Sequence, residues 1–241
     1  MPPLSASRIC YDKAMVDTPD SDSSSWFSRL VGNNRFWILA LAITGSVIIA
    51  GFVQLQIPDT TLQSIRIGQA FGFLSLALLY LAMLISPLTK VFTKLPGREG
   101  LVYARRAIGV SAFYYAVLHV YITFFDQLNG FGGIAYLNPT YGWSLLSGIF
   151  ALGVLCSMAA TSFDWVVAKM GYRQWKMLHR LVYAASVAIL VHLLLIGSHF
   201  ANGVTILGVV TYAAVGLLVV LEVVRIGRVV LQKRLRDEKE R

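Results

Sequence analysis

Charged residues are scarce in this sequence. Asp, Glu, Lys and Arg make up only 14% of its 241 residues, whereas 56% are hydrophobic and the mean hydropathy is +0.65. Soluble domains carry about 25% charged residues, so this composition excludes an ordinary soluble domain. We therefore interpret the chain as a membrane protein.

The sequence also lacks the motifs that hold most redox cofactors outside a membrane. Its two cysteines, Cys10 and Cys156, lie far apart, and there is no C-x-x-C-H motif for covalent haem attachment. The segments between apolar runs are too short to fold into a flavin or nicotinamide domain. A formal G-x-G-x-x-A match at Gly130–Ala135 follows a membrane helix, whereas a dinucleotide fingerprint needs a strand before it. We do not interpret this match as a cofactor site.

Long uncharged runs make up most of the chain. They extend over 36–58, 67–89, 107–125, 127–163 and 181–221, and a membrane span needs about 20 mainly apolar residues. The last run is long enough for two helices, and turn residues fill the first half of the fourth. We therefore expect an all-α membrane protein, a bundle of six transmembrane helices at about 37–56, 68–88, 106–125, 143–163, 178–196 and 204–224.

Lysine and arginine set the expected orientation of these helices. They concentrate in the N-terminal tail, the second and fourth loops and the C-terminal end, and the first loop has only Arg66. All basic residues except Arg66 therefore lie on one side of the membrane if both termini are cytoplasmic. This pattern explains the net charge of +9 without a nucleic acid partner. It also predicts that the cytoplasmic face attracts anionic membrane lipid.

The apolar runs divide the chain into three parts. Residues 1–35 are polar, show no signal peptide and are expected to form a disordered cytoplasmic tail, with Met15 as an alternative start to Met1. Residues 36–225 are expected to form the six-helix domain. Residues 226–241 follow as a basic cytoplasmic tail.

Two histidines are expected to meet inside the bundle, because ionisable side chains in a membrane face its interior. His119 lies 13 residues above Arg106, and His192 lies 13 residues above His179. At 1.5 Å per residue, both stand about 20 Å from the cytoplasmic end of their helices. Two imidazoles at one height can ligate a haem iron from both faces. The alternative is that each is a lone interhelical hydrogen-bond donor, but the matched depth favours haem.

His179 is a third candidate ligand, at the cytoplasmic end of the fifth helix. On a regular helix it points roughly 140° away from His192, so a π-bulge or a differently placed second haem would be needed. At its level the third helix carries Arg105 and Arg106, which either bind haem propionates or serve as positive-inside anchors. His199 is a weak candidate metal ligand, because a histidine at the water interface explains it more simply.

Three stretches of the sequence carry a family resemblance. They are "GQAFGFLSLALLYLAMLISPL" (68–88), "RRAIGVSAFYYAVLHVYITFF" (105–125) and "TSFDWVVAKMGYRQWKMLHRLVYAASVAILVHLL" (161–194). Over roughly residues 65–200 the chain resembles the ferric-reductase-like transmembrane family. Within it, the stretches are most similar to the haem-binding membrane subunits of bacterial methionine-sulfoxide reductase systems. The arginine pair and the W-x-x-L-H-R-L-V-Y run make this resemblance specific.

The resemblance implies a six-helix b-type cytochrome of the bacterial cytoplasmic membrane, with one or two haems. His119, His179 and His192 fall on the three ligand histidines of the family. Relatives take electrons from a cytoplasmic flavin reductase or the quinone pool, so FMN or quinone is a further candidate cofactor. They pass the electrons to an extracytoplasmic molybdopterin oxidoreductase that repairs oxidised methionine.

Other functions stay open at this point. A ferric reductase or an orphan transmembrane electron carrier would share the same core. A small transporter of protons or metal would need broken helices or acids at the membrane midplane, whereas Glu222 lies at the end of a span. A haem-free scaffold is the remaining alternative. Haem content distinguishes the last two from a cytochrome.

Overall fold

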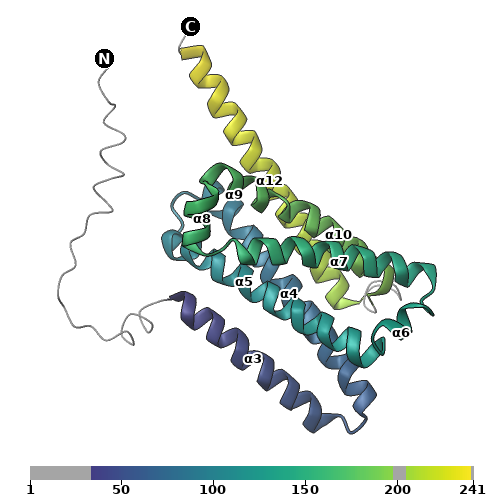
Figure 1. Cartoon of the computed structure of the whole chain (residues 1–241). Helices are drawn as coiled ribbons and strands as arrows, with labels where there is room; N and C mark the ends of the chain where they lie inside the picture. Colours follow the sequence, from purple (N-terminus) through teal and green to yellow (C-terminus); the bar gives the residue numbers. More distant parts are fainter. Residues whose placement is uncertain (1–33, 198–204, 240–241) are drawn as a thin grey trace, which may run out of the picture. The chain divides into compact units, whose positions relative to one another are not determined.

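The computed structural model of the chain describes residues 34–197 and 205–239, which belong to one compact unit. All regular structure in these residues is helical (Figure 1), and six stretches are long and apolar enough to cross a membrane. The elements are α3 (Asn34–Gln56), α4 (Thr60–Val91), α5 (Arg98–Ile122), the π-helix η1 (Thr123–Gln127), α6 (Phe131–Ile134), α7 (Pro139–Ala160), α8 (Asp164–Met170), α9 (Tyr172–Arg180), α10 (Val182–Ile196) and α12 (Ile206–Lys239). The expected six-helix architecture is confirmed, while the side on which each terminus lies stays a prediction.

The helices extend beyond the apolar runs that predicted them. α4 begins at Thr60, where the Leu62 N–H donates a hydrogen bond to the Asp59 carboxylate at 2.7 Å and caps the helix. α12 continues through basic and acidic residues to Lys239, so most of the expected C-terminal tail prolongs this helix. Hydropathy marks the part of a helix that suits a bilayer, whereas the helix itself ends at its caps.

Four helices meet at the core of the bundle. The largest buried cluster joins α4, α5, α7 and α10 through Leu79, Met83, Ala112, Leu155 and Val182. α4 lies against α5, and α7 lies against α10, along most of their lengths (Figure 1). α3 packs on α4 and α5, and α12 packs on α4. Inward-pointing side chains of these four helices therefore share one core.

The fifth membrane-crossing stretch is not one regular helix. It consists of α9 and α10, which are separated at Leu181, where the Leu181 N–H donates to the Leu178 carbonyl at 3.0 Å. This bond spans three residues, so the turn is tightened as in a 3₁₀-helix. The π-bulge considered for this helix is absent from the segment. The structure has π-helical geometry instead at η1, just after α5.

Candidate functional site

His119 on α5 and His192 on α10 face each other in the core. Their ring centroids lie 6.2 Å apart and their planes are nearly perpendicular, at 86°. Both side chains are half-buried. The structure thus brings together the two histidines that were paired by their matched depth, and we call them the paired-histidine site.

The hydrogen bonds of His119 define its protonation. Its Nδ1 lies 2.8 Å from the backbone carbonyl oxygen of Gly68 on α4. A carbonyl oxygen can only accept, so Nδ1 carries the hydrogen and donates it. In the neutral ring, Nε2 then keeps its lone pair, which is the form of imidazole that binds a metal.

His192 is held in the same way from α7. Its Nδ1 lies 2.9 Å from the carbonyl oxygen of Ser144 and also 2.9 Å from the Ser144 hydroxyl oxygen. The carbonyl again assigns the hydrogen to Nδ1 and leaves Nε2 free to bind. In both histidines Nε2 is therefore the ring nitrogen without a hydrogen.

Two glycines make these hydrogen bonds possible. A Cβ atom at Gly72 would lie 3.0 Å from Nδ1 of His119, and one at Gly148 would lie 3.1 Å from Nδ1 of His192. Each glycine follows the acceptor residue, Gly68 or Ser144, by one helical turn. Any larger residue would press on the ring that reaches past it. Sequence reasoning missed these four residues, although a pair of small residues four apart is a known mark of close helix packing.

The paired-histidine site fits a haem iron. Two metal–imidazole bonds of about 2 Å, plus half a ring on either side, separate two axial ring centroids by roughly 6 Å. The observed 6.2 Å agrees with this separation. The other nitrogen of each ring, Nδ1, bonds a backbone carbonyl. Backbone carbonyls are among the groups that commonly orient histidines that bind a metal.

His179 on α9 stands in different surroundings. Its Nδ1 lies 3.1 Å from the carbonyl oxygen of Trp175, one turn earlier on the same helix. The Trp175 ring lies against the imidazole, with centroids 4.1 Å apart, and its indole N–H donates to the Thr161 carbonyl at 3.1 Å. We call His179 and Trp175 the single-histidine site.

The two arginines near His179 have different partners. Arg105 donates its Nε hydrogen to the Ala82 carbonyl at 3.0 Å. Arg106 forms an ion pair with Asp164 and lies 5.4 Å above the Trp175 ring. The hydrogen bond from Arg106 lowers the pKa of the Asp164 carboxyl below its usual value. Sequence reasoning missed Asp164, because it belongs to a loop segment whose path only the fold defines.

Arg35 on α3 joins the same acid. Its guanidinium lies 3.5 Å from the Asp164 carboxylate, so α3, α5 and the start of α8 are linked by charge. The side chain of Asp164 is 75% exposed, and exposed ion pairs of this kind contribute about 0–1 kcal/mol.

Glu222 on α12 is not a free intramembrane acid. It accepts a hydrogen bond from the Tyr183 hydroxyl at 2.9 Å and pairs with Arg225 at 3.1 Å. Its side chain is 14% exposed. These partners neutralise it, which counts against a role in carrying protons. His199 lies outside the residues that the structure describes.

We call the acceptor and the glycine beside each ring its cradle: Gly68 and Gly72 for His119, and Ser144 and Gly148 for His192. Comparison with known families places this helical bundle in one class of protein. Residues 71–190 match the family described as "Ferric reductase like transmembrane component". The chain therefore belongs to the ferric-reductase-like transmembrane family, as the sequence resemblance indicated. The match includes His119 and His179 and ends two residues before His192.

Curated relatives refine this placement. The chain is 34% identical over 125 residues to the protein-methionine-sulfoxide reductase heme-binding subunit MsrQ of Brucella ovis, and equally to that of Brucella abortus. The alignments cover 52% of this chain and 54% of each relative. It is also 34% identical over 122 residues to the magnetosome protein MamZ of Magnetospirillum gryphiswaldense, over 48% of this chain and 18% of MamZ. The chain thus spans about half the length of the MsrQ proteins and less of MamZ. No solved structure matches it.

Proposed function

We propose that this chain is a b-type haem protein that carries electrons across the bacterial cytoplasmic membrane. The electrons come from a cytoplasmic flavin reductase or the quinone pool and pass to an extracytoplasmic acceptor, the catalytic subunit of a methionine-sulfoxide reductase. The observation that carries the proposal is the paired-histidine site, where His119 and His192 each hold Nδ1 on a carbonyl and keep Nε2 free. The names of the MsrQ relatives support it.

In this mechanism the protein positions and insulates, and a bound haem supplies one-electron exchange at its iron. His119 and His192 would ligate the iron with Nε2, while Gly68 and Ser144 keep both rings in the ligating tautomer. A second haem would be held by His179. Arg105 is suited to its propionates, since guanidinium groups match carboxylates. Arg106 is already paired with Asp164.

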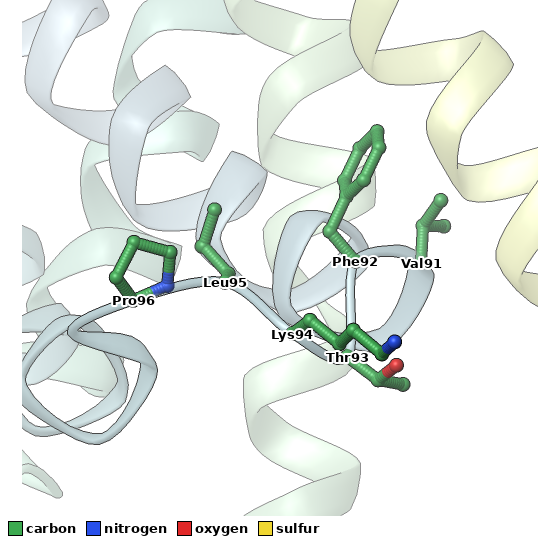
Figure 2. Close-up of a pocket in the computed structure, with 6 residues that line it drawn as sticks. All are labelled: Val91, Phe92, Thr93, Lys94, Leu95 and Pro96. Carbon is green, nitrogen blue, oxygen red and sulfur yellow. The ribbon is translucent and has the colours of Figure 1, made fainter.

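Electrons would enter at the basic loops, which we assign to the cytoplasmic side together with both termini. The end of α4 and the loop that follows it line a hollow of about 390 Å³ with residues Val91–Pro96, and Lys94 and Thr93 are among the side chains around it (Figure 2). Arg228 of α12 donates to the Val91 carbonyl at 2.8 Å and adds a cation there. Positive charge at this loop attracts an acidic flavoprotein or a flavin phosphate.

The test begins with the purified protein expressed with ample haem. Haem is quantified per chain, and a dithionite-reduced minus oxidised spectrum is recorded. We expect b-type bands and one or two haems per chain. A chain without haem would contradict the proposal.

Electron transfer is then tested in liposomes that contain trapped ferricyanide. External dithionite should reduce the trapped ferricyanide faster when the protein is present. In the double variant His119→Ala/His192→Ala the rate should fall to that of protein-free liposomes. Ser157→Ala, at an exposed position of α7, is the control and should keep the wild-type rate. Equal rates for the wild type and the double variant would show that the pair does not carry the electrons.

A further inference from the structure

Ser144 meets His192 with two groups at once. Its carbonyl oxygen and its hydroxyl oxygen each lie 2.9 Å from Nδ1 of His192, and the side chain is fully buried, at 0% exposure. The same hydroxyl lies 3.1 Å from the backbone carbonyl oxygen of His192. Ser144 is therefore bonded to both the ring and the main chain of the histidine.

The hydrogens of this cluster have a single consistent assignment. The carbonyls of Ser144 and His192 can only accept. The Ser144 hydroxyl must therefore donate to the His192 carbonyl, which leaves its lone pairs to accept from Nδ1. The Ser147 hydroxyl also donates to the Ser144 carbonyl at 2.8 Å. All hydrogen bonds of the cluster agree on Nδ1–H and on Nε2 as the free nitrogen.

The matching position on the other side of the pair lacks a hydroxyl. His119 donates to the carbonyl of Gly68, which has no side chain. Each acceptor is followed by a glycine one turn later, Gly72 or Gly148, so the two cradles otherwise correspond. His192 thus has two acceptors for its Nδ1–H where His119 has one.

We propose that Ser144 is a positioning residue that tunes the iron bound by His192; this inference rests on the proposed haem function. A stronger hydrogen bond at Nδ1 makes an imidazole a more basic ligand. A more basic ligand favours ferric over ferrous iron. The Ser144 hydroxyl therefore lowers the reduction potential of the paired-histidine site and stops His192 from rotating.

The test compares Ser144→Ala with Ser157→Ala in the full-length protein. Ser157 lies on the same helix and is exposed, and its hydroxyl donates to the Gly153 carbonyl of its own helix at 2.9 Å. Haem content is measured first, and the reduction potential follows by spectroelectrochemical titration of the component that disappears in His192→Ala. In Ser144→Ala we expect the reduction potential to rise by up to ~59 mV, which is a tenfold change in the one-electron redox equilibrium constant. Ser157→Ala should keep the wild-type value.

The outcomes separate this inference from the proposed function. Wild-type protein without haem overturns both. Haem with an unchanged potential in Ser144→Ala overturns the role of Ser144 alone. If Ser144→Ala loses the haem, Ser144→Thr decides, because it keeps the hydroxyl. A wild-type haem content and potential in Ser144→Thr support positioning by the hydroxyl, whereas loss of haem in Ser144→Thr as well, which keeps the hydroxyl, contradicts it.

Discussion

The paired-histidine site and the single-histidine site differ in whether the imidazole bonds to another helix or to its own. His119 and His192 each donate to a carbonyl on another helix, and a glycine beside that carbonyl leaves room for the ring. His179 is fixed by a carbonyl of its own helix and by the Trp175 ring, with charged groups nearby. The first arrangement needs the whole bundle to be folded, whereas the second is largely local to α9. We infer that tertiary packing defines the paired site and that the local sequence defines the single one.

Alanine substitutions of the histidines test this contrast with the largest expected effect. His119→Ala or His192→Ala should abolish the haem of the paired site, because each variant removes one of the two nitrogens that would hold the iron. His179→Ala should leave that haem in place and remove only a second one. Haem per chain and the reduced minus oxidised spectrum measure both. Loss of the same bands in His179→Ala and His119→Ala would show that the two sites are not independent.

The glycines of the cradles provide a smaller perturbation. In Gly72→Ala or Gly148→Ala the added methyl group would lie 3.0 or 3.1 Å from Nδ1, so the ring must shift by a few tenths of an ångström and its hydrogen bond to the acceptor is weakened. We expect haem to be held at the paired site about 10-fold more weakly, the low end for loss of a partner that orients a ligand. Transfer of haem to apomyoglobin measures this. Gly51→Ala is the control, since nothing lies within 4 Å of a Cβ there. An equal loss of haem affinity in Gly51→Ala would contradict the claim that Gly72 and Gly148 leave room for the two rings.

Trp175→Phe should affect only the single-histidine site. Phenylalanine keeps a ring against His179 but loses the indole hydrogen bond to the Thr161 carbonyl, which is worth about 1 kcal/mol. We expect several-fold faster release of the His179-dependent haem and no change at the paired site. Trp165→Phe is the control, because Trp165 is 63% exposed on α8. Faster release from the paired site would mean that the two sites share their packing.

The smallest expected effect concerns the ion pair beside the single-histidine site. Arg106 lowers the pKa of Asp164 below 3.8 in the folded protein, so the pair stabilises the fold above that pH and is lost as the pH falls through the folded pKa. Asp164→Asn should therefore lower the free energy of unfolding at pH 7 by less than about 1 kcal/mol. A slightly lower thermal unfolding temperature measures this change. The difference should vanish in acid. If the wild type and Asp164→Asn differed more in unfolding temperature in acid than at pH 7, the ionised Asp164 carboxylate would not be the source of the difference.

Sequence patterns predicted the parts of this molecule that depend on depth and length. Apolar runs gave the six spans, and the equal distances from Arg106 to His119 and from His179 to His192 predicted their pairing. Both results follow from a constant rise per residue. They do not require knowledge of how helices rotate about their axes.

The cradle residues could not be predicted in the same way. That Gly68 and Ser144 face the rings depends on the rotation of α4 and α7, which an almost uniformly apolar surface does not reveal. The interruption at Leu181 falls at the start of the apolar run 181–221, directly after Arg180, where the sequence has no Pro or Gly to mark the end of a helix. The Arg106–Asp164 pair requires the path of a loop. Whether the histidines bind haem stays a prediction.

The tightened turn at Leu181 divides one membrane crossing into two helices, α9 and α10. Each of them is bonded to the rest of the bundle separately. Trp175 ties α9 to the Thr161 carbonyl, and His192 ties α10 to Ser144 of α7. The surroundings of His179 and those of His192 are thereby set by different contacts, although both residues belong to one crossing.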